Sequence, residues 1–219
     1  MRIFTRPITL LLSTICLMVA VTSPGNTQET ALNTTGVVNL YGLTLQFPLP
    51  DWVDATEPEN ILGQSNYRRD EQLSYLFIDQ IPAQESFDSY ANLYKIAATR
   101  GSTASLEGAI STLIEENRAH CTKDTFAPFA SNPVPDGALV TILCGDLTSA
   151  NSEGRGMILH SRVFQRDTVS IYVTREWIGN GFQLSDGSDG TRPVSPADFE
   201  ALSNRLLADT ALTGAQRVD

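Results

Sequence analysis

Residues that could exchange protons or bind a charged ligand are concentrated between positions 160 and 176. Histidine, arginine, tyrosine and glutamate supply acids, bases and hydrogen-bond donors, and phenylalanine adds an apolar contact surface. The residues concerned are His160, Arg162, Phe164, Tyr172 and Glu176. If they share one face of a sheet, they form a surface patch suited to binding a ligand.

The two segments that carry these residues, 156–165 and 168–177, have the composition of paired strands. The apolar positions 157, 159 and 163 should lie on the same face as 169, 171 and 173, and only a loop of odd length preserves that alternation. Residues 165–167 provide such a loop. The sequence therefore predicts a hairpin whose opposite face carries all five residues of the patch.

Cys121 and Cys144 are the cysteines that remain once a leader containing Cys16 is removed. An even number of cysteines in an exported protein favours a disulfide. We expect this bond to join directly opposed residues of two adjacent antiparallel strands. The same register would place Thr122 opposite Leu143.

Other signals of catalysis or metal binding are weak. His120 and His160 could complete a metal site with the cysteines, but zinc needs three or four protein ligands at characteristic spacings. The loop at 186–190 has the look of a calcium loop but lacks the bidentate glutamate. Trp52 and Trp177 either line a ligand groove or pack in the core. No catalytic, cofactor-binding or metal-binding residue is predicted, and the sequence favours a protein that is not an enzyme.

The beginning of the chain has the layout of a secretory signal peptide. Arg2 and Arg6 precede an apolar run at 8–21, which is too short to span a bilayer as a helix, and small polar residues follow. We predict a signal peptide over 1–25, a flexible polar tether over 26–35, and a periplasmic or secreted location. No stable membrane anchor is expected after the leader is removed.

Composition limits the class of partner. The formal net charge is −10 at pH 7, whereas nucleic-acid binding requires clustered lysine and arginine. Nucleic acid is therefore excluded as a partner. The acidic surface either keeps an exported protein in solution or contacts a basic protein, so the partner is an unknown protein or a small molecule.

The rest of the chain is predicted to form one domain over 36–212, followed by a tail at 213–219. In the segments 73–81 and 139–144, apolar residues occupy both odd and even positions. This pattern indicates strands that are buried on both faces. Strands are expected at 37–41, 43–47, 66–69, 73–81 and 139–144, in addition to the hairpin above. Helices are expected at 86–100, at 106–114 and after Ser195-Pro196. The predicted fold class is α+β, with a central antiparallel sheet and helices packed on both of its faces.

The order of these elements is similar to that of the PsbP-like family. The opening strand ends in Pro48-Leu49-Pro50-Asp51-Trp52, and a hairpin, a helix, long antiparallel strands and a final helix follow. The resemblance implies a sheet sandwiched by helices and an accessory or binding role without a fixed catalytic set. We therefore predict a non-enzymatic accessory or binding module. A hydrolase with an unrecognised carboxylate or arginine site and an envelope-assembly subunit that binds basic partners are the alternatives.

Overall fold

A computed structural model describes residues 35–53, 65–70, 75–101, 105–130, 137–148, 154–185 and 192–214. The predicted signal peptide, the tether up to residue 34 and the tail beyond residue 214 lie outside the described residues, as does the loop at 186–190. Within the described ranges, no helix is both long enough and apolar enough to cross a membrane.

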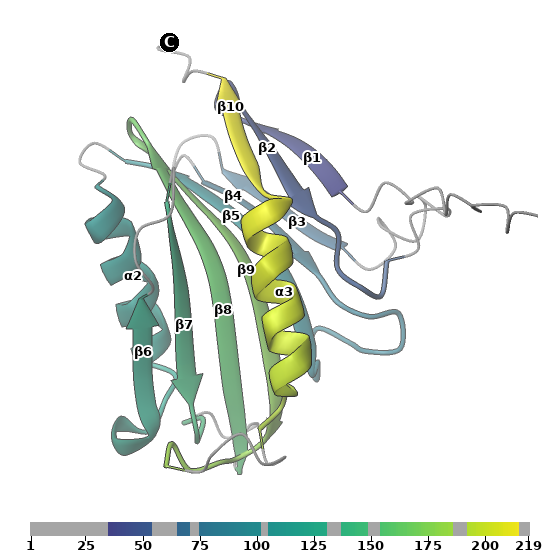
Figure 1. The fold of residues 1–219 in the computed structure, drawn as a ribbon, viewed down its shortest axis with the longest axis vertical. Helices are drawn as coiled ribbons and strands as arrows, with labels where there is room; N and C mark the ends of the chain where they lie inside the picture. The colour runs from purple at the N-terminus through teal and green to yellow at the C-terminus, as the bar shows by residue number, and fades with distance from the viewer. Residues whose placement is uncertain are drawn as a thin grey trace, which may run out of the picture. The chain divides into compact units, whose positions relative to one another are not determined.

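The main element is an antiparallel sheet of seven strands (Figure 1). Its order is β3 (Ser65–Asp70), β4 (Tyr75–Gln80), β5 (Asn92–Arg100), β9 (Val169–Asn180), β8 (Arg155–Arg166), β7 (Ala138–Cys144) and β6 (Phe126–Ala130). A second sheet has the order β1 (Thr35–Leu40), β2 (Leu43–Pro48) and β10 (Ala211–Gly214). β8 and β9 are the longest strands and lie in the middle, so both of their faces are buried over most of their length.

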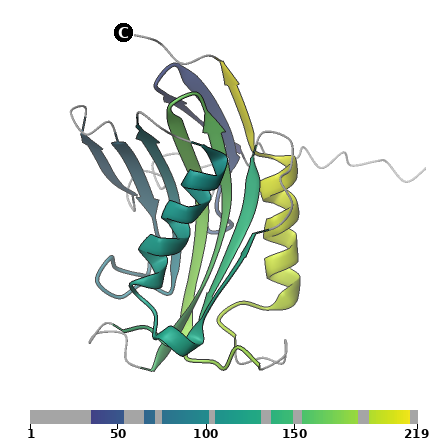
Figure 2. The same ribbon diagram turned by 90° about the vertical axis from the view of Figure 1, so that its left-hand side faces the viewer.

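One face of the seven-stranded sheet packs against the helix α2 (Leu106–Arg118), which lies across its strands in Figure 2. The Oγ of Ser105 accepts a hydrogen bond from the backbone N–H of Gly108 (3.0 Å), which caps the first turn. Ala109 and Leu113 are the buried residues of the helix. They pack with a cluster from β7 and β8 that contains Val140, Ile142, Leu159 and Val163.

The other face is covered by the helix α3 (Pro196–Ala208) together with the three-stranded sheet. Ser195 caps α3 by accepting the N–H of Asp198 (3.1 Å), and Pro196 occupies the first turn, where its missing N–H costs nothing. Leu206 is fully buried in a core shared with the leucines of β2 and with Phe164 and Ile171.

The predicted fold class, in which helices pack on both faces of one sheet, is wrong. Strands dominate the described chain, a second sheet forms much of one covering layer, and only two α-helices occur in the described ranges. The predicted helix at 86–100 is the main error, because Asn92–Arg100 is the strand β5. Gly101 therefore follows a strand rather than closing a helix.

Several other predicted elements are confirmed. β1 and β2 occupy the two expected opening segments, and β3 and β4 form the expected antiparallel pair. The segment at 139–144 lies in β7. The helix expected at 106–114 extends to Arg118, and the helix after Ser195-Pro196 is α3.

The predicted parity of the β8–β9 hairpin is wrong. Arg166 pairs with Val169, so the turn is the two residues Asp167 and Thr168 rather than a loop of odd length. Asp167 has φ = 52°, a left-handed conformation that aspartate tolerates in tight hairpin turns. Gln165 Nε2 donates to the carbonyl of Asp167 (2.8 Å), which favours the tight turn. Odd positions of β8 consequently share a face with even positions of β9.

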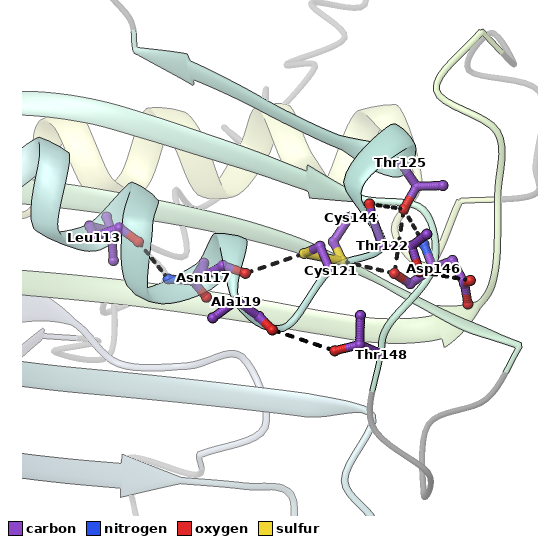
Figure 3. Close-up of a disulfide and its surroundings, with 9 residues drawn as sticks. All are labelled: Leu113, Asn117, Ala119, Cys121, Thr122, Thr125, Cys144, Asp146 and Thr148. Carbon is purple, nitrogen blue, oxygen red and sulfur yellow. Dashed lines mark hydrogen bonds between the residues drawn. A yellow bond between two sulfur atoms is a disulfide. The ribbon is translucent and has the colours of Figure 1, made fainter.

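The predicted disulfide between Cys121 and Cys144 is present, with Cα atoms 5.6 Å apart (Figure 3). The predicted register around it is wrong. Cys144 lies opposite Phe126 and Met157 in the sheet, while Cys121 follows α2 and forms an isolated bridge with Leu147. The bond therefore connects the C-terminal end of α2 to β7, rather than two opposed strand residues.

Hydrogen bonds next to the disulfide hold the same junction together (Figure 3). Thr122 Oγ1 donates to Asp146 Oδ2 (3.0 Å), and the N–H of Asp146 donates to Thr125 Oγ1 (3.1 Å). Asn117 Nδ2 donates to the carbonyl of Leu113 within α2 (2.8 Å). The end of α2 is thus fixed to the sheet by both covalent and polar contacts.

Candidate functional site

A groove of about 380 Å³ lies between α2 and the seven-stranded sheet. Among the described elements, α2 packs mainly on β6, β7 and β8 and makes fewer contacts with β4, β5 and β9 on the same face. The groove lies beside α2, where β4, β5 and β9 are less covered. Its volume falls in the range of small-molecule sites, which is roughly 300–1,000 Å³. We call it the α2 groove.

The α2 groove has apolar and aromatic side chains on several sides. They come from β4, β5, β8 and β9, from α2, and from the segments before β5 and after β7. The apolar and aromatic lining residues are Phe77, Tyr90, Ala97, Leu113, Leu147, Met157, Leu159, Tyr172 and Ile178. Such a lining favours a ligand with an apolar body.

A polar network lies in the same groove. Lys95 Nζ is 3.4 Å from Glu176 Oε1, and the hydroxyl of Tyr90 donates a hydrogen bond to Glu176. The side chain of Glu176 is 9% exposed and that of Lys95 is 30% exposed. Burial raises the pKa of Tyr90, and the negative charges of Glu176 and Asp79 raise it further. Tyr90 is therefore a neutral hydrogen-bond donor at physiological pH.

The wall formed by α2 and the residues after it adds further polar groups. Thr112, Glu116, Asn117 and His120 line the groove from this side. Burial raises the pKa of Tyr172 on the sheet, and the charge of Glu116 raises it as well. The hydroxyl of Tyr172 donates a hydrogen bond to the carbonyl of Ala109 in α2 (3.3 Å). The groove thus contains two carboxylates, from Glu116 and Glu176, and one ammonium group, from Lys95.

The structure divides the predicted surface patch between the two faces of the sheet. Tyr172 and Glu176 line the α2 groove. His160, Arg162 and Phe164 lie on the opposite face, because Tyr172 pairs with Val163 and Glu176 with Leu159. All five residues are at least nine-tenths buried, so the expectation of one exposed patch is wrong.

Sequence reasoning missed Phe77, Tyr90 and Lys95 as groove residues. Lys95 and Tyr90 fell within the predicted helix at 86–100, and Phe77 was assigned to a strand without a site. Reading 92–100 as a strand would have placed Lys95, Ala97 and Thr99 on one face, which is the face of the groove.

On the opposite face, His160 packs under α3. Its Nδ1 is 2.8 Å from Thr141 Oγ1, and its ring centroid is 4.6 Å from that of Phe199. Burial lowers the pKa of His160 to about 4, so the imidazole is neutral at physiological pH. Arg162 lies over the ring of Phe164, 4.7 Å from its centroid.

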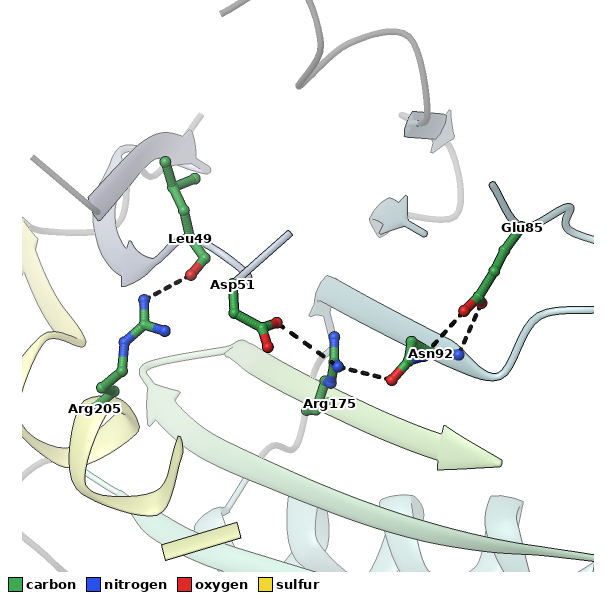
Figure 4. Close-up of polar contacts among 6 residues, drawn as sticks. All are labelled: Leu49, Asp51, Glu85, Asn92, Arg175 and Arg205. Carbon is green, nitrogen blue, oxygen red and sulfur yellow. Dashed lines mark hydrogen bonds and ion pairs between the residues drawn. The ribbon is translucent and has the colours of Figure 1, made fainter. Parts of the chain in front are cut away.

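Arg175, near the end of β9 on this same face, is held between tryptophans. Its Cζ is 3.9 Å from the ring centroid of Trp52 and 5.3 Å from that of Trp177. Nη2 donates to Asn92 Oδ1 at 2.8 Å and lies 3.8 Å from Asp51 Oδ1 (Figure 4). Burial lowers the pKa of Arg175 to about 10. Trp52 and Trp177 therefore pack against a buried cation, rather than lining the α2 groove.

The described residues contain no group of three or more His, Cys, Asp or Glu side chains that could hold a metal ion. His120 lines the α2 groove, whereas His160 lies on the opposite face of the sheet. The alternative in which both histidines join the cysteines around a metal is therefore contradicted, and the cysteines are bonded to each other.

The described residues form a mostly β protein with a groove beside α2, and comparison with known proteins adds little to this description. No family model and no curated protein sequence matches the chain. Among solved structures, the chain is similar to the Ran-binding protein Mog1p of Saccharomyces cerevisiae, with 12% identity over 81% of this chain and 94% of that chain and a TM-score of 0.43. A mutant of protein Mog1 gives 11% identity over 81% and 95%, also with a TM-score of 0.43. Likeness at this level carries no functional argument, and the resemblance to the PsbP-like family stays a prediction.

Proposed function

We propose that this protein is an exported binding module that holds a small molecule in the α2 groove. The observation that carries the proposal is the composition of the groove, in which an apolar and aromatic lining surrounds the few polar groups around Glu176. Binding sites for small molecules combine these two features, because the apolar surface supplies affinity and a few polar groups fix orientation.

Export is supported by the arginine-flanked apolar leader and by the disulfide. Disulfides persist in oxidising compartments and are rare in the cytosol of most organisms. The bond between Cys121 and Cys144 is buried and joins the end of α2 to β7. It therefore supports the groove structurally in the compartment that the leader predicts.

Binding is tested by a thermal-shift screen of small molecules on the purified protein, followed by calorimetric titration of the hits. A ligand that binds the folded state raises its melting temperature. Thr112→Trp places an indole in the groove from an exposed position on α2, and we expect it to weaken binding at least about ten-fold.

Ser111→Trp is the matched control, because Ser111 is the adjacent exposed residue and is not a groove residue. This variant should bind as the wild type does. Equal affinity of the wild type and Thr112→Trp for every hit would refute the α2 groove as the binding site.

A hydrolase remains a second candidate because Glu116 and Glu176 place two carboxylates in one groove, and carboxylate pairs serve as acid and base in hydrolysis. A panel of ester, glycoside and peptide substrates tests it. Saturable turnover that is abolished in both Glu116→Gln and Glu176→Gln would favour the enzyme over the binding module.

A further inference from the structure

We infer that the α2 groove takes a small organic cation, a protonated amine or quaternary ammonium group attached to an apolar body. This inference rests on the proposed function and specifies the class of ligand. Three features of the groove carry it, namely the charges of its lining residues, its aromatic residues and its combination of polar and apolar lining.

Counted over its lining residues, the groove holds two carboxylates and one ammonium group. Glu176 is the carboxylate on the sheet, and Lys95 lies 3.4 Å from it. Glu116 is the carboxylate on α2, and no ion pair to it occurs among the residues that the structure describes. A monocation would therefore bring the groove to neutrality, whereas an anion would add to the negative charge.

Lys95 does not make the groove a site for anions. Its ammonium is engaged with Glu176, and its cross-strand neighbour on β4 is Asp79, a further acidic residue that is 5% exposed. An anionic ligand would have to compete with Glu176 for Lys95 and would approach Glu116 at the same time. Repulsion from these two carboxylates opposes such a ligand.

Aromatic residues in the groove favour a cation as well. Phe77, Tyr90 and Tyr172 all line it. The face of an aromatic ring attracts a cation within about 6 Å of its centroid, and sites for quaternary ammonium groups are built from such rings. The hydroxyl of Tyr90 is directed to Glu176, which places that ring beside a carboxylate.

The apolar body of the ligand would lie along the remaining lining. Ala97, Leu113, Met157 and Leu159 are buried groove residues that carry no charge. A ligand with a cationic end near the carboxylates and a ring or alkyl chain against these residues matches the distribution of polar and apolar surface. Inorganic cations and highly polar polyamines would leave the apolar part uncovered.

Calorimetric titration of the purified exported protein with three probes of similar size tests the inference. The probes are phenethylammonium, 3-phenylpropionate and 2-phenylethanol, which share a ring and differ in charge. We expect phenethylammonium to bind at least about ten-fold more tightly than either of the others at low salt and to weaken as salt is added. Tighter binding of the anion or equal binding of all three would overturn the inference.

Two adjacent glutamates provide a matched pair of variants. Glu116→Gln should weaken phenethylammonium about three-fold and leave 2-phenylethanol unchanged, because Glu116 lines the groove and Gln removes its charge. Glu115→Gln should change neither, because Glu115 pairs with Arg118 and is not a groove residue. Equal effects of the two substitutions would contradict a specific role for Glu116.

Failure of this inference is distinguishable from failure of the proposed function. If the three probes do not bind but another compound binds and is blocked by Thr112→Trp, the groove is a binding site and the cation is the wrong class. If phenethylammonium binds equally to the wild type and to Thr112→Trp, its site lies elsewhere and the inference is wrong, while the proposed function is refuted only if every other hit of the screen behaves in the same way.

Discussion

Buried polar residues of the central strands have specific partners. Ser161 and Thr174 form a hydrogen bond of 2.8 Å between neighbouring strands, and His160 bonds Thr141 in the same way. Arg175 donates a hydrogen bond to Asn92 and lies over the ring of Trp52. Because an unsatisfied buried polar group costs about 1–3 kcal/mol, these pairings constrain which side chains the sheet can accept.

Acid should destabilise the protein through His160. The pKa of His160 is about 4 in the folded protein against 6.5 for the exposed side chain. Below pH 6.5 the unfolded state therefore binds a proton that the folded state excludes, and stability falls as the pH decreases from 6.5 through 4. Full loss corresponds to about 3 kcal/mol. The check is the free energy of unfolding in urea at pH 8 and at pH 4.5.

His160→Leu is the control for this acid effect. The charged neighbours of His160 are cationic: Arg175 is its partner on β9, and Arg162 is the next residue on the same face of β8. Thr141 and Phe199 contribute no charge. The variant should lose less stability than the wild type over the same pH interval, and equal losses would show that other groups cause the effect.

Tyr94→Phe should destabilise the C-terminal end of β2. The hydroxyl of Tyr94 donates to the carbonyl of Pro48 at 2.6 Å in a buried position, and Phe leaves that carbonyl without its donor. We expect a loss of about 1–2 kcal/mol in the free energy of unfolding. Tyr75→Phe, at a half-buried tyrosine of β4, is the matched control. Similar losses for both variants would contradict a special role for the Pro48 contact.

At the level of elements, segments with alternating or uniformly apolar patterns and well-marked caps were predictable. β2 alternates Leu43, Leu45 and Phe47 with polar residues, and α3 begins with Ser195-Pro196. β5 was not predictable in this way, because it is buried on both faces and its apolar residues also recur at helical spacing. Glu85 accepts hydrogen bonds from the N–H groups of Ala91 and Asn92, a turn contact that no helix or strand periodicity indicates.

The candidate site was predicted only in part for a related reason. Tyr172 and Glu176 were expected to contact a ligand and do lie in the groove. His160, Arg162 and Phe164 were placed beside them because the loop was taken as three residues. A single residue of loop length reverses the face of every side chain in a strand, and the left-handed conformation of Asp167 decides that length here.

Removal of the disulfide should lower stability without abolishing the fold. The bond closes a loop with a sequence separation of 23, for which the chain-entropy model gives about 3 kcal/mol. We expect the Cys121→Ser, Cys144→Ser double variant to lose about that amount in urea unfolding.

Reduction of the disulfide in the wild type tests the same prediction without a substitution. The wild type should approach the double variant in reducing conditions, and the double variant should not respond. A double variant as stable as the oxidised wild type would show that the bond adds nothing to the junction of α2 and β7.

At the scale of the whole molecule, the α2 groove follows from how much of the sheet each layer covers. The seven-stranded sheet is wider than α2. Residues of β4, β5 and β9 therefore line the groove beside the C-terminal half of this helix. On the other face, α3 and the three-stranded sheet share the covering. Charged side chains such as Glu176 and Lys95 can lie on this part of the sheet because they line a groove rather than a packed layer.

Export is the part of the proposed function that rests on the signal peptide predicted over 1–25. Expression of the full-length gene in a Gram-negative host should give periplasmic protein whose N-terminus lies near residue 26, since the small polar residues after the apolar run favour cleavage there. Fractionation and N-terminal sequencing measure both. Cytosolic protein that retains Met1 would contradict the prediction.

The most direct test of the binding proposal is an amide chemical-shift titration of the purified protein with the tightest-binding compound of the screen. We predict saturable shifts concentrated in β5 and β9 from 95 to 99 and from 172 to 178, and in α2 and the residues after it from 112 to 120. Amides of α3 should change little. Saturable shifts centred on α3 or on the three-stranded sheet, with no response around Glu176, would contradict the account.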